Sequence, residues 1–285
     1  MNGIIIINKE QGLTSRDVVN KLIKILNTKK IGHTGTLDPI AKGVLVVTVG
    51  RATKLCELLT SEYKEYIATM KLGIETDTLD ITGNTIKEKE YSVNIDKIKE
   101  VLNSFLGKSI QEVPKYSAIK INGKKLYEYA RNNIDIEVPK REIDIKSIDL
   151  ISYKEDTISF KCTVSKGTYI RSLIRDIAYK LNTVGTMTDL IRTKQGNFDI
   201  ENSNTIEDIE NNNYKLITYE QALNNYEIVN IDDNTYNKVK NGGIINKCFK
   251  NKIALLKYKD DIIAIYKEYN KDVTKAKPYI MLITN

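Results

Sequence analysis

The chain of 285 residues is poor in the side chains that bind metals: it has one histidine and three cysteines. Cys56, Cys162 and Cys248 lie far apart and are odd in number, and the sequence has no C-x-x-C pair. One histidine cannot complete a zinc site with them, and a catalytic Cys–His pair fits poorly. We therefore predict small buried or bystander cysteines and no metal.

Motifs for nucleotide cofactors and serine hydrolases are missing as well. The sequence has no Walker phosphate loop, no G-x-G-x-x-G fingerprint, and no G-x-S-x-G elbow to support the single histidine as part of a triad. The apolar run at residues 4–7 is far too short for a signal peptide or a membrane span. These absences predict a cytoplasmic protein that needs no cofactor and no membrane.

The charge of the chain, +7 in total, is arranged in blocks. Residues 1–60 contain nine Lys and Arg against four Asp and Glu, and residues 161–196 contain seven against two. Residues 199–233 have one lysine against nine acids, and residues 234–285 have eleven lysines against four acids. An AT-rich genome can produce a Lys-, Asn- and Ile-rich protein without functional cause. The blocks favour a basic surface that faces a polyanion, divided by an acidic connector.

Apolar periodicity predicts strands and helices in irregular alternation. Short β-branched or alternating runs indicate strands at residues 3–8, 43–50, 65–73 and 157–164. Apolar residues at helical spacing indicate helices at residues 14–27, 94–107 and 168–182, the first of them capped by Thr14 or Ser15. The pattern favours an α+β fold with a mixed, largely antiparallel sheet flanked by helices.

The last sixty or so residues differ from this pattern, because they consist mostly of short strands. In KIALLKYKDDIIAIYKEY (residues 252–269), two apolar runs flank a KDD turn, which indicates a hairpin. We expect one domain over residues 1–225 and a small β-rich domain over residues 226–285. Within the first, residues 111–145 are basic and rich in tyrosine and turns, and we expect a loop–helix excursion there.

The stretch IGHTGTLDPIAKGVLVV, residues 31–47, contains the single histidine, His33. Its three glycines permit sharp turns, and a residue before proline is biased away from the α region. Asp38 is therefore expected on an extended, tightly held loop that leads into a strand. Taken alone, an Asp-Pro pair is usually a turn, and a lone histidine is usually a packed or surface side chain.

The longer string GHTGTLDPIAKGVLVVTVGRATKL resembles the catalytic-aspartate motif of bacterial tRNA pseudouridine-55 synthases. The resemblance continues through KEYIATMKLGIETDTLDITG, YSAIKINGKKLYEYAR, SKGTYIRSLIRDIAYKL and MTDLIRTKQGNF, over nearly all of residues 1–200. It implies a pseudouridine synthase catalytic fold in residues 1–225, with an RNA-clasping insertion at about 111–145. Residues 226–285 fit the PUA-like RNA-binding domain of this family.

The resemblance also implies a reaction and its central residues. These enzymes break the glycosidic bond of uridine 55 in the tRNA T-loop, rotate the uracil and rejoin it through C5, on a flipped-out base. Asp38 matches the catalytic aspartate, as nucleophile or as base. Arg171 matches the arginine that pairs with it and keeps it ionised, and it lies near the start of an expected helix, where a cation is disfavoured. Tyr66 matches the tyrosine that stacks on the target base.

Four further residues are expected near the substrate by the same resemblance. His33 fills space beside the flipped-out bases, and an imidazole can stack on a base. Leu190 and Tyr169 form walls of the pocket. Lys9 corresponds to a lysine near the site, with a structural or supporting role. Arg175, one turn after the paired arginine, is expected at the surface.

Two departures from the family pattern affect loops. The family usually begins with Asp-Lys-Pro, whereas this chain has Asn8, Lys9 and Glu10, and it usually has two prolines before Ser-Ala, whereas here Val113 precedes Pro114. Both departures bear on loop rigidity more than on activity.

The preferred interpretation is a stand-alone, monomeric enzyme that acts on the T-arm of tRNA without a protein partner. An RNA-guided synthase that depends on accessory proteins is one alternative, which the compact chain fits poorly. A non-catalytic RNA-binding or tRNA-folding protein on the same scaffold is another.

Overall fold

A computed structural model describes residues 1–60, 62–132 and 134–283. Nine strands of the described residues form one mixed sheet. Their bounds are β1 Gly3–Lys9, β2 Ile31–Thr34, β3 Lys42–Val49, β4 Lys64–Leu72, β7 Gly107–Glu112, β10 Lys140–Lys154, β11 Thr157–Val164, β12 Gly185–Gln195 and β13 Phe198–Asp199. The order is β1-β3-β12-β4-β11-β10-β7, with β2 beside β3 and β13 beside β12. Neighbouring strands are antiparallel except β12 and β3, which confirms the predicted fold class.

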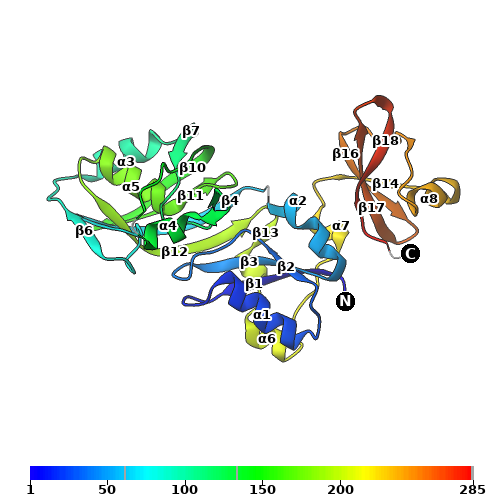
Figure 1. The fold of residues 1–285 in the computed structure, drawn as a ribbon, viewed down its shortest axis with the longest axis horizontal. Coiled ribbons are helices and arrows are strands. Elements are labelled where there is room, and N and C mark those ends of the chain that lie inside the picture. Colours follow the sequence, from blue (N-terminus) through cyan, green and yellow to red (C-terminus); the bar gives the residue numbers. More distant parts are fainter. Residues whose placement is uncertain (61, 133, 284–285) are drawn as a thin grey trace.

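Strand β12 joins the two halves of this sheet. On one side it pairs with β3, where Arg192 lies opposite Gly43. On the other side it pairs with β4, where Leu190 lies opposite Ala68. In Figure 1, β12 crosses from the N-terminal strands to the half formed by β4, β11, β10 and β7. The loop before β3 and the start of β4 therefore meet beside β12.

The strands β1 and β3 are apolar at consecutive positions because both of their faces are covered. Ile4 and Ile6 pack in a cluster that includes side chains of the C-terminal residues. Ile5 and Ile7 face the opposite way and pack with Leu22 of helix α1 (Ser15–Ile25). Figure 1 shows α1 and α6 (Ile206–Glu210) together along this edge of the sheet.

Helix α1 (Ser15–Ile25) begins at one of the two predicted caps. The Thr14 side chain accepts a hydrogen bond from the Asp17 amide, and the Asp17 carboxylate accepts one from the Thr14 amide, which is a capping box. Helices α3 and α5 cover the other half of the sheet, α3 against β10 and α5 against β12 and β4. Elsewhere before residue 226 the elements are η1 Gly50–Leu55, α2 Cys56–Thr60, β5 Ile74–Thr76, β6 Thr85–Glu88, α3 Ile95–Asn103, α5 Ile170–Lys180, η2 Ile200–Asn202, α6 Ile206–Glu210 and α7 Tyr219–Ala222.

The tyrosine-rich excursion is shorter than the predicted range of residues 111–145. Strand β7 continues to Glu112 and β10 begins at Lys140, so both ends of the range belong to the sheet. Between them lie a hairpin and one short helix, with bounds β8 Lys120–Ile121, β9 Lys124–Lys125 and α4 Leu126–Arg131. The start of β10 is charged because it pairs with the exposed strand β7 at the edge of the sheet. The sequence therefore did not predict a strand there.

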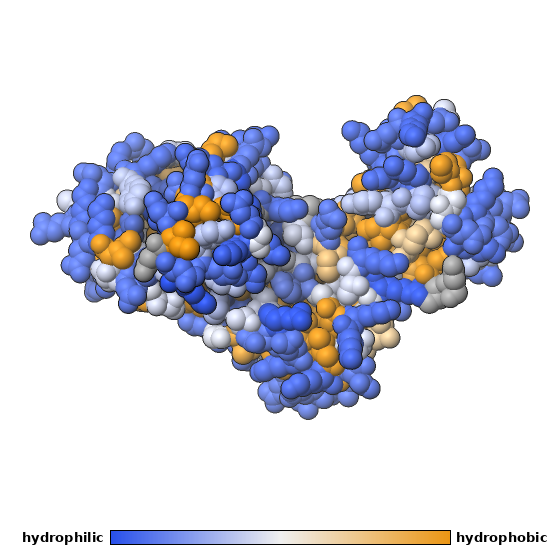
Figure 2. Space-filling view, in the orientation of Figure 1, coloured by the Kyte–Doolittle hydropathy of each residue, from blue (hydrophilic) through white to orange (hydrophobic). Residues whose placement is uncertain are grey.

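The C-terminal residues form a separate five-stranded sheet within the described part of the chain. Its elements are β14 Glu227–Asn230, α8 Asp233–Val239, β15 Ile245–Asn246, β16 Ile253–Tyr258, β17 Asp261–Tyr269 and β18 Asp272–Met281. The predicted hairpin is present, with Tyr258 opposite Asp261. Leu255 and Ile265 share an apolar cluster with β1 and β3, and Figure 2 shows hydrophobic side chains gathered where this sheet meets the body. The predicted domain division after residue 225 falls between α7 and β14 and stays a prediction.

No helix in the described ranges is long and apolar enough to cross a membrane.

Candidate active site

Asp38 lies in the loop between β2 and β3, which we call the Asp38 loop (residues 35–41). A single side chain from β12 joins the start of this loop to strand β3, which follows it. Arg192 donates from Nη2 to the Gly35 carbonyl at 3.0 Å and from Nε to the Val44 carbonyl at 2.7 Å. Its side chain is fully buried, so the two hydrogen bonds are shielded from water.

Both neighbours of Asp38 are also fixed through their backbone. The Ser15 hydroxyl accepts a hydrogen bond from the Leu37 amide at 2.9 Å and lies 3.3 Å from its carbonyl oxygen. Lys9 Nζ donates to the Pro39 carbonyl at 3.5 Å. The sequence-predicted rigid loop is therefore supported from α1, from the end of β1 and from β12.

Arg171, the second residue of α5, holds the Asp38 carboxylate in a two-bond fork. Nε donates to Oδ2 at 2.9 Å and Nη2 to Oδ1 at 3.2 Å. The guanidinium also donates to the carbonyl oxygens of Thr78 at 2.8 Å and Tyr116 at 3.1 Å. The Arg171 side chain is 6% exposed and that of Asp38 is 35% exposed, so the carboxylate remains accessible while its partner is hidden.

A second carboxylate lies beside Arg171. Asp80, in the loop between β5 and β6, has Oδ2 3.8 Å from Nη1 of Arg171. Asp80 accepts hydrogen bonds from the Thr82 amide at 3.1 Å and from the Thr78 hydroxyl at 3.0 Å, which fix its orientation. A cation is disfavoured both by burial and by the N-terminus of a helix. Two carboxylates and two carbonyls offset this cost at Arg171.

The first turn of α5 is fixed by Gln111, at the end of β7. Its Oε1 accepts from the Tyr169 amide at 2.8 Å and its Nε2 donates to the Tyr169 carbonyl at 3.1 Å. Gln111 is 2% exposed. Because Tyr169 is the residue before α5, this pair of hydrogen bonds sets where the helix starts and where Arg171 points.

The Asp38–Arg171 pair lies in the wall of a cavity of about 480 Å³. Of the sequence-predicted residues, Tyr66, Tyr169 and Leu190 line it together with Asp38 and Arg171. Tyr66 and Leu190 are 6% and 5% exposed and come from the neighbouring strands β4 and β12. The cavity thus has apolar and aromatic walls beside an oriented carboxylate, which suits a flat uncharged ring next to a reacting bond.

Positive charge dominates the walls of this cavity. Among the described residues that line it, Asp38 is the single carboxylate. The lining cations are Lys64, Arg141, Lys166, Arg171 and Arg192. Such a surface attracts an anionic ligand. Within the described part of the chain, no three His, Cys, Asp or Glu side chains are placed to hold a metal ion.

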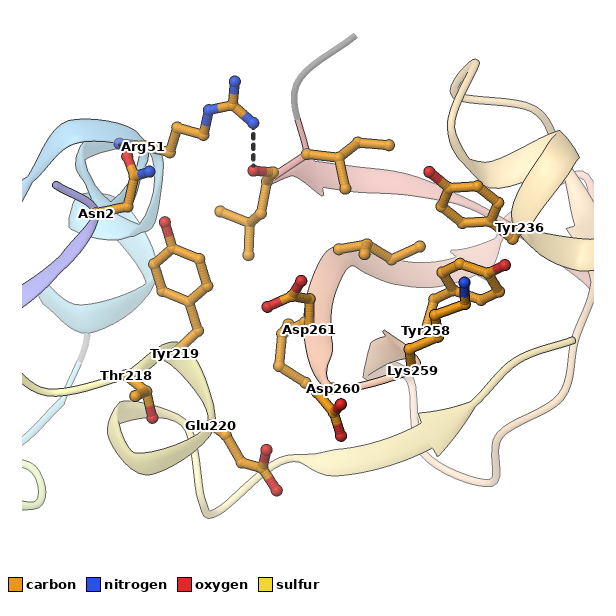
Figure 3. Close-up of a pocket in the computed structure, with 14 residues that line it drawn as sticks. Asn2, Arg51, Thr218, Tyr219, Glu220, Tyr236, Tyr258, Lys259, Asp260 and Asp261 are labelled. Carbon is orange, nitrogen blue, oxygen red and sulfur yellow. Dashed lines mark hydrogen bonds between the residues drawn. The ribbon is translucent and has the colours of Figure 1, made fainter. Parts of the chain in front are cut away.

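A second cavity, of about 610 Å³, lies between the body and the C-terminal sheet (Figure 3). Arg51 and Tyr219 come from the body, Asp260 comes from the turn between β16 and β17, and Asp261 is the first residue of β17. Figure 3 shows Arg51 reaching the C-terminal sheet, where its Nη1 donates to the Leu282 carbonyl at 2.9 Å. We call this cavity the interdomain groove.

Comparison with known proteins identifies the family. A protein-family model described as "TruB family pseudouridylate synthase (N terminal domain)" matches residues 23–170, more than half of the chain. The chain belongs to the TruB family of pseudouridylate synthases. A second family model, described as "tRNA pseudouridylate synthase B C-terminal domain", matches residues 171–226. This range contains β12 and all of α5 except its first residue, and it ends before the C-terminal sheet.

Curated relatives and solved structures agree with this membership. The chain is 45% identical over 272 residues to the tRNA pseudouridine synthase B of Clostridium tetani, covering 94% of this chain and 93% of the relative. It is 45% identical over 279 residues to that of Mesoplasma florum, covering 97% of each. A structure of an H/ACA RNP bound to a substrate RNA containing 2'-deoxyuridine has a TM-score of 0.74 at 25% identity, over 99% of this chain and 85% of that chain. The predicted family and enzyme class are confirmed.

Two family-matched residues, Lys9 and His33, are not among the side chains that line the cavity. Lys9 is fully buried, and its ammonium donates to the carbonyls of Glu10 at 2.9 Å and Leu13 at 2.6 Å, besides that of Pro39. Burial lowers the Lys9 pKa to about 8. The Lys9 side chain supports the Asp38 loop from within, and a contact of Lys9 with substrate stays a prediction.

His33 lies on β2, directly before the Asp38 loop, and is half-buried. Burial, and then the charges of Arg192 and Arg16, lower its pKa, which favours a neutral imidazole at pH 7. Its buried Nδ1 has no hydrogen-bond partner among the described residues. The expected contact of His33 with flipped-out bases stays a prediction.

The prediction that Arg175 lies at the surface is wrong. Its side chain is 14% exposed and forms ion pairs with Asp176 at 2.8 Å and Glu112 at 3.4 Å. Three residues of the site were not predicted from the sequence: Asp80, Gln111 and Arg192. Asp80 stands in one of the family-like strings, and a carboxylate in that string was the available signal. Arg192 stands in the string MTDLIRTKQGNF, which offered the same kind of signal. Gln111 had none, because a polar residue in a strand is ordinarily expected at the surface.

Proposed function

We propose that this pseudouridine synthase converts uridine 55 in the T-loop of tRNA to pseudouridine, with Asp38 as the catalytic carboxylate. The observation that carries the proposal is the two-bond pair between Arg171 and Asp38 in a cavity whose other charged wall residues are cations. The curated relatives that the chain matches are tRNA pseudouridine synthases B.

The isomerisation rearranges bonds that the substrate already has. The bond between ribose C1′ and uracil N1 breaks, the uracil turns, and C1′ bonds to C5. C5 then loses its proton and N1 takes one up. There is no net oxidation and no group donor, so the reaction requires no cofactor. Asp38 acts on the sugar or the base as nucleophile or as base, and both roles need an ionised carboxylate. Arg171 fixes the orientation of the carboxylate through its two hydrogen bonds.

The cavity also accounts for the capture of the base. Extrusion of uridine from a folded loop costs a few kcal/mol of stacking. Tyr66 and Tyr169 offer rings, and Leu190 an apolar contact, to a uracil that enters beside Asp38. His33 lies at the entry to the same loop, where its neutral imidazole can occupy the space that the base leaves.

The enzyme is proposed to act on the T-arm as a monomer in the cytoplasm. Asp38, Arg171 and the lining aromatic residues all belong to one chain, so no second subunit is needed to complete the pair. An RNA-guided mechanism with accessory proteins is a weaker candidate. The Cbf5-Nop10-Gar1 complex matches with a TM-score of 0.73 but at 26% identity, below the 45% of the bacterial tRNA enzymes.

The test is tritium release from unmodified tRNA transcript labelled at uridine C5, with wild type, Asp38→Asn and Asp156→Asn. Asp156 is a matched control, because it pairs with Lys71 at 3.1 Å and its side chain is 34% exposed, against 35% for Asp38. We expect release by wild type and Asp156→Asn, at the T-loop position, and a loss of at least about a hundredfold for Asp38→Asn.

Three results would contradict the proposal. Tight RNA binding by wild type without tritium release would favour a non-catalytic RNA-binding or folding protein. Equal release by wild type and Asp38→Asn would mean that another carboxylate acts. Release that maps outside the T-loop would refute the substrate position.

A further inference from the structure

The cavity contains two buried cations that have no carboxylate partner. Arg171 is matched by Asp38 and Asp80. Lys64 and Arg192 are equally hidden, 6% and 0% exposed, yet neither forms an ion pair with a described carboxylate. A buried charge without a counter-ion lowers the stability of the folded protein. Two such charges beside a substrate cavity therefore indicate a role in binding.

Lys64 is placed to reach the substrate. It starts β4 two residues before Tyr66, and alternate residues of a strand share a face, so both side chains line the same cavity. Its Nζ donates to the carbonyls of Thr60 at 2.8 Å and Glu62 at 2.7 Å, which uses two of its three hydrogens. The four-carbon stem lets the ammonium turn toward a ligand that enters the cavity.

Of the three charged groups that act on Lys64, two are cations, Arg192 and Lys166, and one is an acid, Glu62. A Cβ on Gly35 would lie 3.4 Å from Lys64 Cε and 3.5 Å from Arg192 Nη1, so the two cations converge under the Asp38 loop. Lys166 approaches from the loop before α5, and Glu62 is the nearby acid. Burial above all, and then the charge of Arg192, lower the pKa of Lys64 to about 8.

We propose that Lys64 binds the phosphodiester group that flanks the target uridine. The proposal rests on the proposed function, since an RNA substrate carries one negative phosphate per nucleotide into this cavity. The phosphate supplies the counter-ion that Lys64 and Arg192 lack in the free protein. A lysine that serves only to bind the carbonyls of Thr60 and Glu62 has no need of a positive pocket, because a neutral donor satisfies the same carbonyls.

The first experiment measures tRNA affinity against salt for wild type, Lys64→Met, Lys64→Arg and Lys71→Met. Lys71 is the matched control, because it lies on the same strand but is half-exposed and paired with Asp156. We expect Lys64→Met to weaken binding about fivefold to tenfold at 0.1 M salt and to lower the salt slope by about 0.7 to 0.9, the value for one phosphate contact. Lys64→Arg and Lys71→Met should keep the wild-type slope.

The stability of the free protein separates this role from a structural one. Loss of an unpaired buried charge should leave the urea midpoint of Lys64→Met equal to or above that of wild type. A lower midpoint with an unchanged salt slope would make Lys64 a structural residue and overturn the proposal. An unchanged midpoint with an unchanged slope would also overturn it.

Proton uptake on tRNA binding gives a second measurement, first made on the wild type. A phosphate next to Lys64 raises its pKa from about 8, so tRNA binding takes up a proton and wild-type affinity should fall between pH 7 and pH 9. The groups that face Lys64 and contribute to its charge state are Arg192, Glu62 and Lys166. Lys64→Met and Lys64→Arg should lose this component, and its persistence in both would refute the assignment. Tritium release by wild type is measured in parallel, so failure of the phosphate site is distinct from failure of the proposed function.

Discussion

The catalytic cavity and the interdomain groove differ in how their charges are balanced. In the catalytic cavity, five cations face the single carboxylate of Asp38 among the described lining residues. The groove has Arg51 and Lys259 against Glu220, Asp260 and Asp261. The lining of the groove is nearly neutral, whereas the lining of the catalytic cavity has an excess of positive charge that an anionic ligand would reduce.

The two cavities also differ in how their side chains are held. Arg171 has hydrogen bonds to Asp38 and to two backbone carbonyls, and Asp38 itself sits on a loop supported from three elements. Glu220, in the groove, makes a solvent-accessible ion pair with Lys257 at 2.8 Å, with side chains 46% and 23% exposed. A small substitution in a preorganised site should lower the catalytic rate or the stability strongly. A substitution in an exposed ion pair should change either quantity very little. Four substitutions test this contrast.

The largest effect is expected from Arg171→Lys. One ammonium cannot reproduce the two-bond fork on Asp38 and also reach the carbonyls of Thr78 and Tyr116. We expect the single-turnover rate with tRNA to fall by about a hundredfold or more, with affinity within about threefold of wild type. Arg175→Lys, the same change on the same helix, is the control and should cost little. A comparable loss in both variants would mean that helix integrity, not the fork, sets the rate.

The next effect concerns the backbone next to the Asp38 loop. Gly43 has a φ of +99°, and a Cβ there would lie 2.3 Å from the Arg192 carbonyl oxygen on β12. Gly43→Ala should lower the free energy of unfolding by about 2 to 3 kcal/mol in urea titration. Gly242→Ala, with a φ of +69° but no atom closer than 4.0 Å, should cost only the strain of about 1 kcal/mol. Equal losses of unfolding free energy in the two variants would show that a small shift of the backbone relieves the close contact with β12.

A smaller effect is expected from Asp80→Asn. The amide keeps hydrogen-bonding capacity toward Thr82 but removes the charge 3.8 Å from Arg171. The rate of tritium release should fall about tenfold while the affinity for tRNA holds, because a charged contact is worth about 1.4 kcal/mol or somewhat more. A rate equal to that of wild type would indicate that Asp38 and the carbonyls suffice to hold Arg171.

The smallest effect is expected in the groove. Glu220→Gln breaks its exposed ion pair with Lys257 and should change the free energy of unfolding by less than about 1 kcal/mol. Tritium release should match wild type, and the salt slope of tRNA binding should not fall. A fall in activity would show that the groove communicates with the catalytic cavity, against the contrast drawn between them.

Sequence patterns predicted the apolar framework well, because strands and helices with one-sided or continuous burial have distinct periods. The runs at residues 3–8 and 43–50 and the cap at Thr14 are examples. Resemblance to the family motifs predicted that Asp38, Tyr66 and Arg171 share one site, although no periodicity of the sequence relates them. Asp80, Gln111 and Arg192 were missed because a polar side chain is buried only through partners that are distant in sequence, and those partners become visible only in the fold.

The place of β12 between β3 and β4 has a consequence for the order in which the protein becomes active. Asp38 belongs to the half of the sheet that is synthesised first, whereas Tyr66 and the strand partners of α5 belong to the other half. The two halves can each begin to form while the ribosome is still translating residues beyond 160, but they have no shared strand until residues 185–195 emerge. A nascent chain that already contains every catalytic side chain therefore still lacks a catalytic site. Long-range pairing of this kind is slow to form, so activity should appear late in folding, as one step with the closing of the sheet.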